Sequence, residues 1–183
     1  MIRHLNSNWP VWATESVEIK TPDPVWLEKG RYEVNRLREH LSPYGVSEVE
    51  HIGSTSIPNL PAKPIIDLMA KISSYDEIEK IAASLKAVNW NYVPPELDGQ
   101  EWRRFFVKVK NDKRECHLHL MLENEERWEK QLLFRNLLRE NPDWTWQYGE
   151  LKKKLAEDYK EDREAYTEAK TDFIKSVLES IDN

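Results

Sequence analysis

Cysteine, glycine and long apolar runs are scarce in this sequence. Cys116 is the one cysteine among 183 residues, which excludes an internal disulfide and a zinc site built from several cysteines. Five glycines stand against eight tryptophans, a balance that favours aromatic packing and helices over a glycine-rich loop architecture. No apolar run reaches the length of a signal peptide or a membrane span. We therefore expect a soluble, cytoplasmic protein without a membrane partner.

Neither sign of charge dominates the chain. Thirty-three acidic residues against 27 lysines and arginines give a formal net charge of −6 at pH 7. A large nucleic-acid interface needs a basic face, so this balance argues against one. The length of 183 residues is enough for one domain with a real core, and we treat residues 1–183 as a single domain.

Hydrophobic periodicity divides the chain into a mixed region and a helical region. Alternation of polar and apolar residues predicts strands at 17–19, 46–52, 64–72, 90–93, 102–109 and 115–122, after an irregular arm at 1–15. Asp23-Pro24 predicts the start of a helix that ends at Leu41, and Ser74 to Glu77 has the pattern of a capping box. From Glu125 the period changes to 3.6, and Asn141-Pro142 predicts a further helix start. The expected fold is α/β (α+β), a mixed sheet with helices followed by a helical C-terminal third.

Gly53-Ser54 and Asp67 form the most informative pair of features. A glycine lets the backbone approach a ligand closely, and the serine beside it offers a hydroxyl and an N–H to phosphate oxygens. A carboxylate within an apolar strand is costly unless it has a partner such as a metal ion. Twelve residues separate Ser54 from Asp67, enough for the chain to turn and return on an adjacent strand. The alternatives are a simple tight turn and a structural Asp67 paired with a cation such as Lys63.

Two further observations bear on metal chemistry. Met69 stands two residues after Asp67, where a second carboxylate on the same strand face is expected, and a thioether is a poor ligand for Mg²⁺. His117 and His119 share a strand face, where they could bind a transition metal, act as acid and base, or pack. His51 is a third imidazole only if its strand lies beside theirs.

Several basic residues suit phosphate groups. Arg103-Arg104 and Arg135 supply guanidinium groups, although adjacent strand residues point in opposite directions. The mixed charges of residues 149–172 predict a solvated helix face.

These residues resemble the signature of the GrpB family. The resemblance rests on the runs Glu50 to Pro58 and Ala62 to Asp67, on Asp23-Pro24 with Trp26, on His117-Leu118-His119-Leu120, and on Phe134-Arg135 with a pattern from Tyr148 to Lys170. It extends over about residues 16–180. It implies a nucleotidyltransferase-like α/β core over 16–124 and a helical part over 125–183. In that superfamily a Gly-Ser turn binds nucleotide phosphates and strand acids hold a divalent metal.

The resemblance leads to a first hypothesis, an enzyme that transfers a nucleotidyl group from ATP or another nucleoside triphosphate. Gly53, Ser54 and Thr55 would hold the triphosphate, with Lys63 or Arg135 adding positive charge. Asp67 would bind Mg²⁺ and matches the first acid of the superfamily's metal motif, whereas Met69 departs from the second. His119 would lie on the strand where a third acid is often found, which makes it the second catalytic candidate.

Two other hypotheses remain open. The protein could be a non-catalytic nucleotide- or anion-binding module that has lost the metal cluster. It could instead be a metal hydrolase that uses His117 and His119 as ligands, with His51 as a third ligand if its strand lies beside theirs. In the first two cases the partner is a nucleotide or a phosphorylated small molecule.

Overall fold

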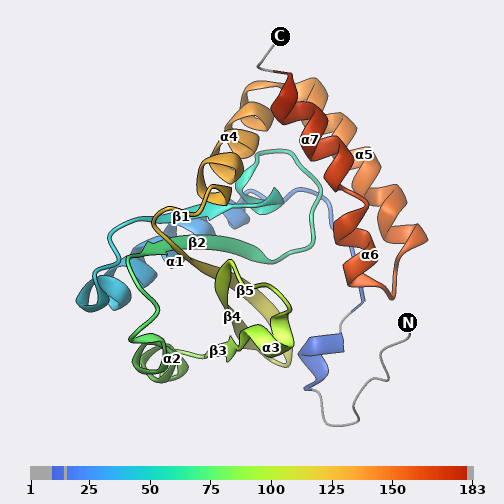
Figure 1. The fold of residues 1–183 in the computed structure, drawn as a ribbon. Helices are drawn as coiled ribbons and strands as arrows, with labels where there is room; N and C mark the ends of the chain where they lie inside the picture. Colours follow the sequence, from blue (N-terminus) through green and yellow to red (C-terminus); the bar gives the residue numbers. More distant parts are fainter. Residues whose placement is uncertain (1–9, 15, 181–183) are drawn as a thin grey trace.

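A five-stranded mixed sheet lies at the centre of the molecule (Figure 1). Its strands are β1 (Val49–Ile52), β2 (Ile66–Ile72), β3 (Trp90–Val93), β4 (Arg103–Lys110) and β5 (Lys113–Leu122). Their spatial order is β1-β2-β5-β4-β3, with β2 and β5 parallel and the other neighbours antiparallel. The computed structural model describes residues 10–14 and 16–180, so most of the predicted arm at 1–15 lies outside the described residues.

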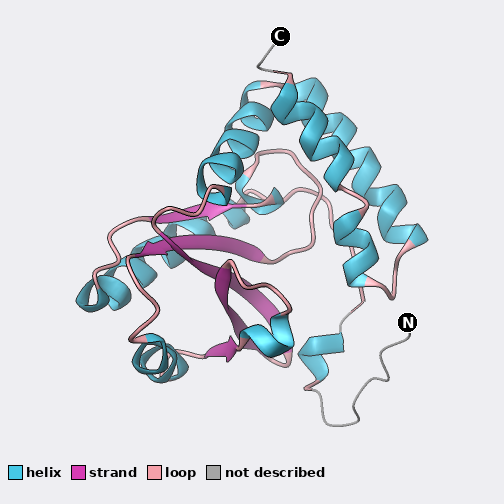
Figure 2. Cartoon of the chain, in the orientation of Figure 1, coloured by secondary structure: helices cyan, strands magenta, loops and turns pink. Residues whose placement is uncertain are grey.

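Helices cover the sheet and make up the whole C-terminal third (Figure 2). They are α1 (Val25–Leu41), α2 (Ile78–Lys86), α3 (Pro95–Asp98), α4 (Arg127–Glu140), α5 (Pro142–Asp158), α6 (Arg163–Glu168) and α7 (Thr171–Glu179). This arrangement confirms the expected α/β class with a helical C-terminal third. Within the described residues, none of the helices has the length and apolar character needed to cross a membrane.

The two faces of β2 differ as the alternating pattern predicts. Ile66, Leu68 and Ala70 are buried in the main apolar cluster with residues of α1 and α2. Met69 belongs to a separate small cluster with Trp128 on the opposite face. The alternation therefore leaves the face of Asp67 available for polar groups.

Strand β5 repeats the same division. Leu118 and Leu120 join the main cluster, and Met121 joins the small cluster on the other side. His117 and His119 occupy the register positions opposite Asp67 and Met69 on β2. The predicted faces of both central strands are confirmed.

Two predicted helix starts are confirmed and one is wrong. Asp23 Oδ1 accepts a hydrogen bond of 2.9 Å from the Val25 amide at the start of α1, and Asn141 Oδ1 accepts one of 3.2 Å from the Trp144 amide at the start of α5. The predicted capping box does not form, because Ser74 Oγ bonds the Asp76 amide and α2 begins only at Ile78.

Some strand boundaries also differ from the prediction. The segment 17–19 is not a strand, since this part of the chain pairs only through a single bridge between Lys20 and Ala62. Strand β1 begins at Val49 rather than at Val46. The hairpin between β4 and β5 turns through Asn111 and Asp112, whose φ angles of 51° and 56° are those of a two-residue hairpin turn.

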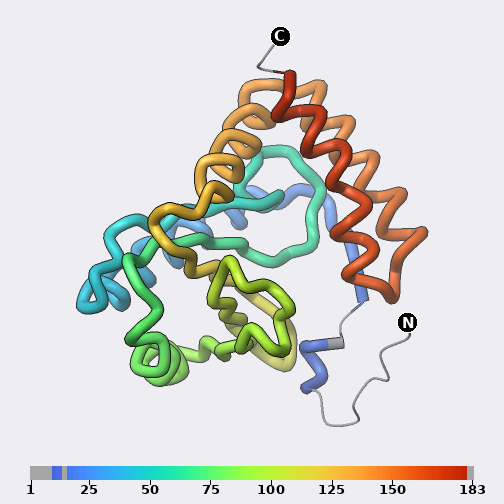
Figure 3. Tube along the Cα trace, viewed as in Figure 1, coloured from blue at the N-terminus to red at the C-terminus, as the bar shows by residue number. Residues whose placement is uncertain are grey.

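The helices α4 to α7 form a second layer with its own apolar cluster. Phe134, Leu138, Tyr148 and Val177 are buried there together with Ile57 and Leu60 of the loop between β1 and β2. Figure 3 shows this loop running between the sheet and the C-terminal helices. The loop thus connects the two layers and carries the chain from Gly53 to Asp67.

Candidate functional site

A hydrogen-bonded carboxylate and imidazole lie at the centre of the polar face. Asp67 on β2 and His117 on β5 are register partners, and His117 Nδ1 lies 2.9 Å from Asp67 Oδ1. The side chain of Asp67 is 30% exposed and that of His117 is 14% exposed. The carboxylate is therefore held by protein on one side and reachable from solvent on another.

The hydrogen bond fixes the proton of His117. Burial lowers the pKa of His117 to about 4, and Asp67 offsets this only in part, so the imidazole is neutral at pH 7. A neutral ring that donates from Nδ1 to a carboxylate keeps its lone pair on Nε2. His117 Nε2 is buried and has no hydrogen-bond partner among the described residues. This atom can accept a proton or a hydrogen bond from a ligand.

His119 has the opposite arrangement. Its Nδ1 accepts a hydrogen bond from Arg103 Nη1, so the neutral ring carries its proton on Nε2. This Nε2 lies 3.9 Å from Asp67 Oδ1, which is too long for a hydrogen bond. Burial lowers the pKa of His119 and favours this neutral form. His119 therefore presents a donor beside Asp67, whereas His117 presents an acceptor.

Asp98 positions Arg103, the arginine that fixes the protonated nitrogen of His119. Arg103 Nε and Nη2 donate to the two carboxylate oxygens of Asp98 over 2.8 and 2.7 Å. A bidentate pair of this kind fixes the guanidinium plane. Sequence reasoning missed Asp98, which lies in the short helix α3 between two predicted strands.

Asp67 is ionised despite its surroundings. Burial raises its pKa, but the hydrogen bond with His117 and the neighbouring His119 outweigh burial and hold the pKa of the carboxyl below its usual range. The site thus combines one negative charge with two neutral imidazoles at pH 7.

Gly53 brings the Gly-Ser turn against this carboxylate. Its φ of 68° lies in the left-handed region that favours glycine, and a Cβ atom at this position would lie 2.6 Å from Asp67 Oδ2. Ser54 then begins a 3-10 turn, and no hydrogen bond with another described residue uses its hydroxyl. The structure therefore brings together Gly53, Ser54 and Asp67.

Thr55, by contrast, is committed to the protein interior. Its side chain is buried, and its Oγ1 donates to the Ile65 carbonyl over 3.1 Å and lies 3.0 Å from His51 Nε2. The Thr55 hydroxyl supports the loop and is not displayed beside Asp67.

Three lysines gather around the same carboxylate. Lys63 precedes β2, Lys152 lies on α5 and Lys170 lies just before α7. Burial lowers the pKa of Lys63 to about 7 and that of Lys170 to about 8, and it holds the pKa of Lys152 well below its usual value. In each case the negative charge of Asp67 acts in the opposite direction and raises the pKa.

Aromatic rings and a backbone carbonyl hold these lysines in place. The ammonium groups of Lys63 and Lys170 lie 4.8 and 4.4 Å from the centroid of the Tyr166 ring. Lys152 Nζ lies 4.9 Å from the Tyr148 ring and donates a hydrogen bond to the Pro61 carbonyl. The lysines thus come from both layers of the molecule.

The prediction of a solvated face over 149–172 is wrong at Lys152, which is 1% exposed. Its position three residues before the buried Leu155 and four after the buried Tyr148 places it on the apolar side of α5. This spacing is visible in the sequence and predicts that Lys152 is buried.

Arg135 and His51 lie elsewhere. Arg135 Nη1 donates to Glu50 Oε2 over 2.7 Å and to the His51 carbonyl over 2.9 Å. His51 packs against Gly30 of α1, and β2 separates its strand from β5. His51 therefore does not join His117 and His119 as a third imidazole.

The described residues do not fit the expected metal clusters. Asp67 is a single carboxylate, and Met69, at the position of a second acid, is completely buried. Mg²⁺ at a phosphoryl-transfer site is normally held by more carboxylate oxygens than one such group supplies. For a transition metal, Nδ1 of His119 is occupied by Arg103, and no group of three potential ligands exists in the described part of the chain.

Comparison with known proteins gives matches in sequence and in structure. The family model described as GrpB protein matches residues 16–180. UPF0157 protein YqkA from Bacillus subtilis is 34% identical over 176 residues, which cover 96% of this chain and 50% of that protein. This chain thus spans half the length of that relative.

Two solved structures share the fold. The conserved protein GrpB from Enterococcus faecalis superposes with a TM-score of 0.78 at 32% identity, covering 89% of this chain and 96% of the other. The Cid1 poly(U) polymerase with bound MgGTP gives a TM-score of 0.53 at 15% identity, covering 76% of this chain and 44% of the polymerase. At that identity the second likeness concerns the fold alone.

Proposed function

Because the chain belongs to the GrpB family and has a nucleotidyltransferase-like fold, we propose that it binds the phosphate groups of a nucleoside triphosphate beside Asp67. Gly53 and Ser54 form one side of the proposed site, and Lys63, Lys152 and Lys170 supply its positive charge. The protein is then a nucleotide-binding module without a carboxylate metal cluster.

The excess of lysines over carboxylates carries this proposal. Three ammonium groups share one neighbouring carboxylate, and burial lowers the pKa of all three. Burying an ammonium group is costly unless an anion accompanies it. A triphosphate supplies the missing negative charge and accepts several charge-assisted hydrogen bonds.

Neutral donors complete the site. The Ser54 hydroxyl, one residue after Gly53, and the Nε2–H of His119, 3.9 Å from Asp67 Oδ1, can donate to phosphate oxygens. Arg103 fixes the proton of His119 in the donating position, and Asp98 fixes Arg103. These residues orient a phosphate group without a metal ion.

The neighbouring lysines of α5 provide a matched test. We expect Lys152→Met to weaken ATP binding about tenfold in metal-free buffer, because it removes a charge-assisted contact while keeping the packing volume. Lys153→Met changes an exposed lysine that pairs with Glu150, and ATP affinity should stay unchanged. Titration calorimetry measures both.

Lys63→Met serves as a second variant if Lys152→Met folds poorly. Equal ATP affinity of the wild type, Lys63→Met and Lys153→Met would remove the basis of the proposal. Absence of ATP binding by the wild type would do the same.

A second candidate function is nucleotidyl transfer to an unknown acceptor, and His117 is the observation that favours it. Its Nε2 lone pair, oriented through Asp67, can accept a hydrogen bond from an attacking hydroxyl that reaches this buried atom. Nucleotidyl transfer is the less favoured function, because a single carboxylate lies at the expected metal position. Pyrophosphate release from ATP in the presence of Mg²⁺ and candidate acceptors, present in the wild type and lost in His117→Asn, would promote it.

A further inference from the structure

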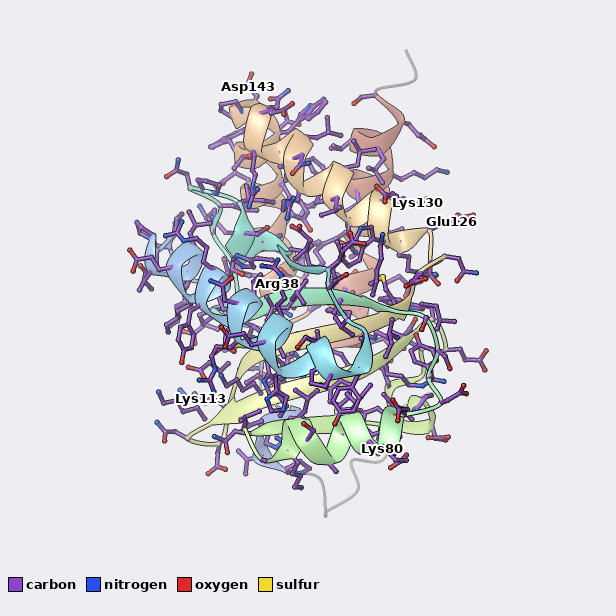
Figure 4. All side chains as sticks on the ribbon, turned by 90° about the vertical axis from the view of Figure 1, so that its left-hand side faces the viewer. Arg38, Lys80, Lys113, Glu126, Lys130 and Asp143 are labelled. Atoms are coloured by element: carbon purple, nitrogen blue, oxygen red, sulfur yellow. The ribbon has the colours of Figure 1, made fainter. Side chains whose placement is uncertain are left out.

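A concave region lies at the free edge of β1, away from the face of Asp67. This groove of about 630 Å³ is bordered by α1, β1, the loop after β1, and α4. Figure 4 looks onto this side of the molecule and labels Arg38 on α1. Its polar and charged lining includes Arg31, Arg38, Glu50, Ser56, Arg135 and Arg139.

The groove is strongly positive in a chain whose net charge is −6. Four arginines and one glutamate line it, so their charges sum to about +3 at neutral pH. His51 also lines the groove but stays neutral, since burial first and then Arg139 and Arg135 lower its pKa to about 4. The positive charge is therefore local and largely uncompensated.

Backbone carbonyls hold three of the guanidinium groups in place. Arg139 Nε and Nη2 donate to the Ser56 carbonyl over 3.0 and 2.8 Å. Arg38 reaches the Ser47 and Val49 carbonyls from α1, and Arg135 bonds Glu50 and the His51 carbonyl from α4. A guanidinium has five N–H donors, so these bonds leave further donors on each arginine.

The geometry points to a second anion site, and we propose that it takes the diphosphate group of a small phosphorylated molecule. Planar guanidinium forks match phosphate oxygens, and arginines fixed in advance lose little freedom on binding. The groove volume lies in the usual range for small-molecule sites, about 300 to 1,000 Å³. A diphosphate also carries about the charge that the four arginines and Glu50 leave unbalanced.

This site is independent of the proposed nucleotide site. Its arginines belong to α1 and α4, whereas the lysines around Asp67 belong to the loop before β2, to α5 and to the start of α7. The segment after β1 separates the two regions, with Gly53 against Asp67 and Ser56 on the groove. Failure of either site leaves the other unaffected.

Arg31 provides the cleanest test, because it is exposed and forms no hydrogen bond or ion pair with another described residue. We expect Arg31→Gln to weaken binding of inorganic pyrophosphate about tenfold without changing the melting temperature. Arg36→Gln is the matched control, since Arg36 lies on the same helix but contacts Tyr32 outside the groove. Its pyrophosphate affinity should equal that of the wild type.

Titrations of ADP and of pyrophosphate into Lys152→Met measure binding at the groove while binding at the proposed nucleotide site is weakened. They also show which of the two ligands the groove binds. The double variant Arg31→Gln/Lys152→Met is then compared with Lys152→Met. Weaker binding of ADP or of pyrophosphate by the double variant supports the proposed diphosphate site in the groove. The ligand whose affinity falls shows whether the site takes a nucleoside diphosphate or free diphosphate. The double variant Arg38→Gln/Arg139→Gln should lose the remaining pyrophosphate binding. Equal affinities of Arg31→Gln and Arg36→Gln for both ligands, or complete loss of binding in Lys152→Met alone, would overturn the proposal.

Discussion

The two faces of the central strands have opposite chemistry although they share a backbone. Leu68 and Leu118, which face α1 and α2, are completely buried among apolar side chains. Their neighbours Asp67 and His117 face the C-terminal helices, where they form a hydrogen-bonded pair that solvent can reach. The apolar face stabilises the fold by burial. The polar groups on the other face are not required for packing of the core.

The polar region is narrow even on its own face. Met69 follows Asp67 on the same side of β2 but packs with Ile52, Met121 and Trp128. A carboxylate at that position would be buried among apolar side chains without a partner. The packing of α4 on the sheet therefore accounts for the missing second acid.

Acid titration should have the largest effect, and it tests both faces at once. Burial lowers the pKa of His51 and of His117 from 6.5 to about 4. The unfolded chain takes up protons below pH 6.5 and the folded protein does not, so stability is intact above this pH and falls as the pH drops towards 4. Each histidine should contribute roughly 3 kcal/mol over this window.

Chemical denaturation across this pH range measures the effect. The variants His51→Gln and His117→Gln should each remove part of the pH dependence, one for each face. A wild type whose stability stays constant between these pH values would contradict the assigned neutral state.

Truncation on the apolar face comes next. Leu118→Ala should lower the free energy of unfolding by about 3 kcal/mol, since it leaves a cavity at a fully buried position. Asp67→Asn keeps the side-chain shape but loses the charge that the hydrogen bond from His117 stabilises, so it should cost about 1.5 kcal/mol, less than the truncation. Urea denaturation compares them, and equal losses would show that the two faces do not differ as described.

Gly53 tests how closely the polar face is packed. Gly53→Ala should cost about 2 kcal/mol, because the new Cβ combines a strained φ with a contact of 2.6 Å to Asp67 Oδ2. Gly99→Ala has a similar φ of 72° but no atom within 4 Å, so backbone strain of about 1 kcal/mol is its whole expected cost. If the two variants lose equal stability, the close approach at Gly53 has no energetic consequence.

The smallest expected effect concerns proton uptake on nucleotide binding. Lys63 and Lys170, with pKa values of about 7 and 8, are partly deprotonated in the free protein above neutral pH. A bound triphosphate favours their charged forms, so ATP affinity should fall as the pH rises, by up to about tenfold per pH unit for each lysine.

Calorimetry in buffers of different ionisation enthalpy measures this uptake directly. Lys63→Met should reduce the number of protons taken up. Binding without any proton uptake in the wild type above neutral pH would contradict the proposed role of the lysines.

The sequence predicted local features well and long-range contacts poorly. The alternation within β2 put Asp67 on the face opposite Ile66 and Leu68, the alternation within β5 put His117 and His119 on one face, and Asn141 was correctly predicted to begin a helix. The spacing of Ser54 and Asp67 predicted their return on adjacent strands, which β1 and β2 confirm. Each of these signals lies within one element or within the loop that joins two neighbouring strands.

What the sequence did not predict depends on contacts between distant segments. Lys152 bonds Pro61, 91 residues earlier, and Arg135 bonds Glu50, 85 residues earlier. Asp98 orients His119 through Arg103 on the strand beside β5. Periodicity identifies the buried side of an element but not the element that covers it.

ATP affinity with and without Mg²⁺, compared between the wild type and Asp67→Asn, tests the central claim most directly. If the lysines bind the phosphates without a metal cluster, the wild type binds ATP in metal-free buffer and Mg²⁺ does not strengthen binding. Asp67→Asn should then bind ATP more tightly, because it removes a negative charge beside the phosphates. An affinity that rises with Mg²⁺ in the wild type and loses this gain in Asp67→Asn would contradict the account.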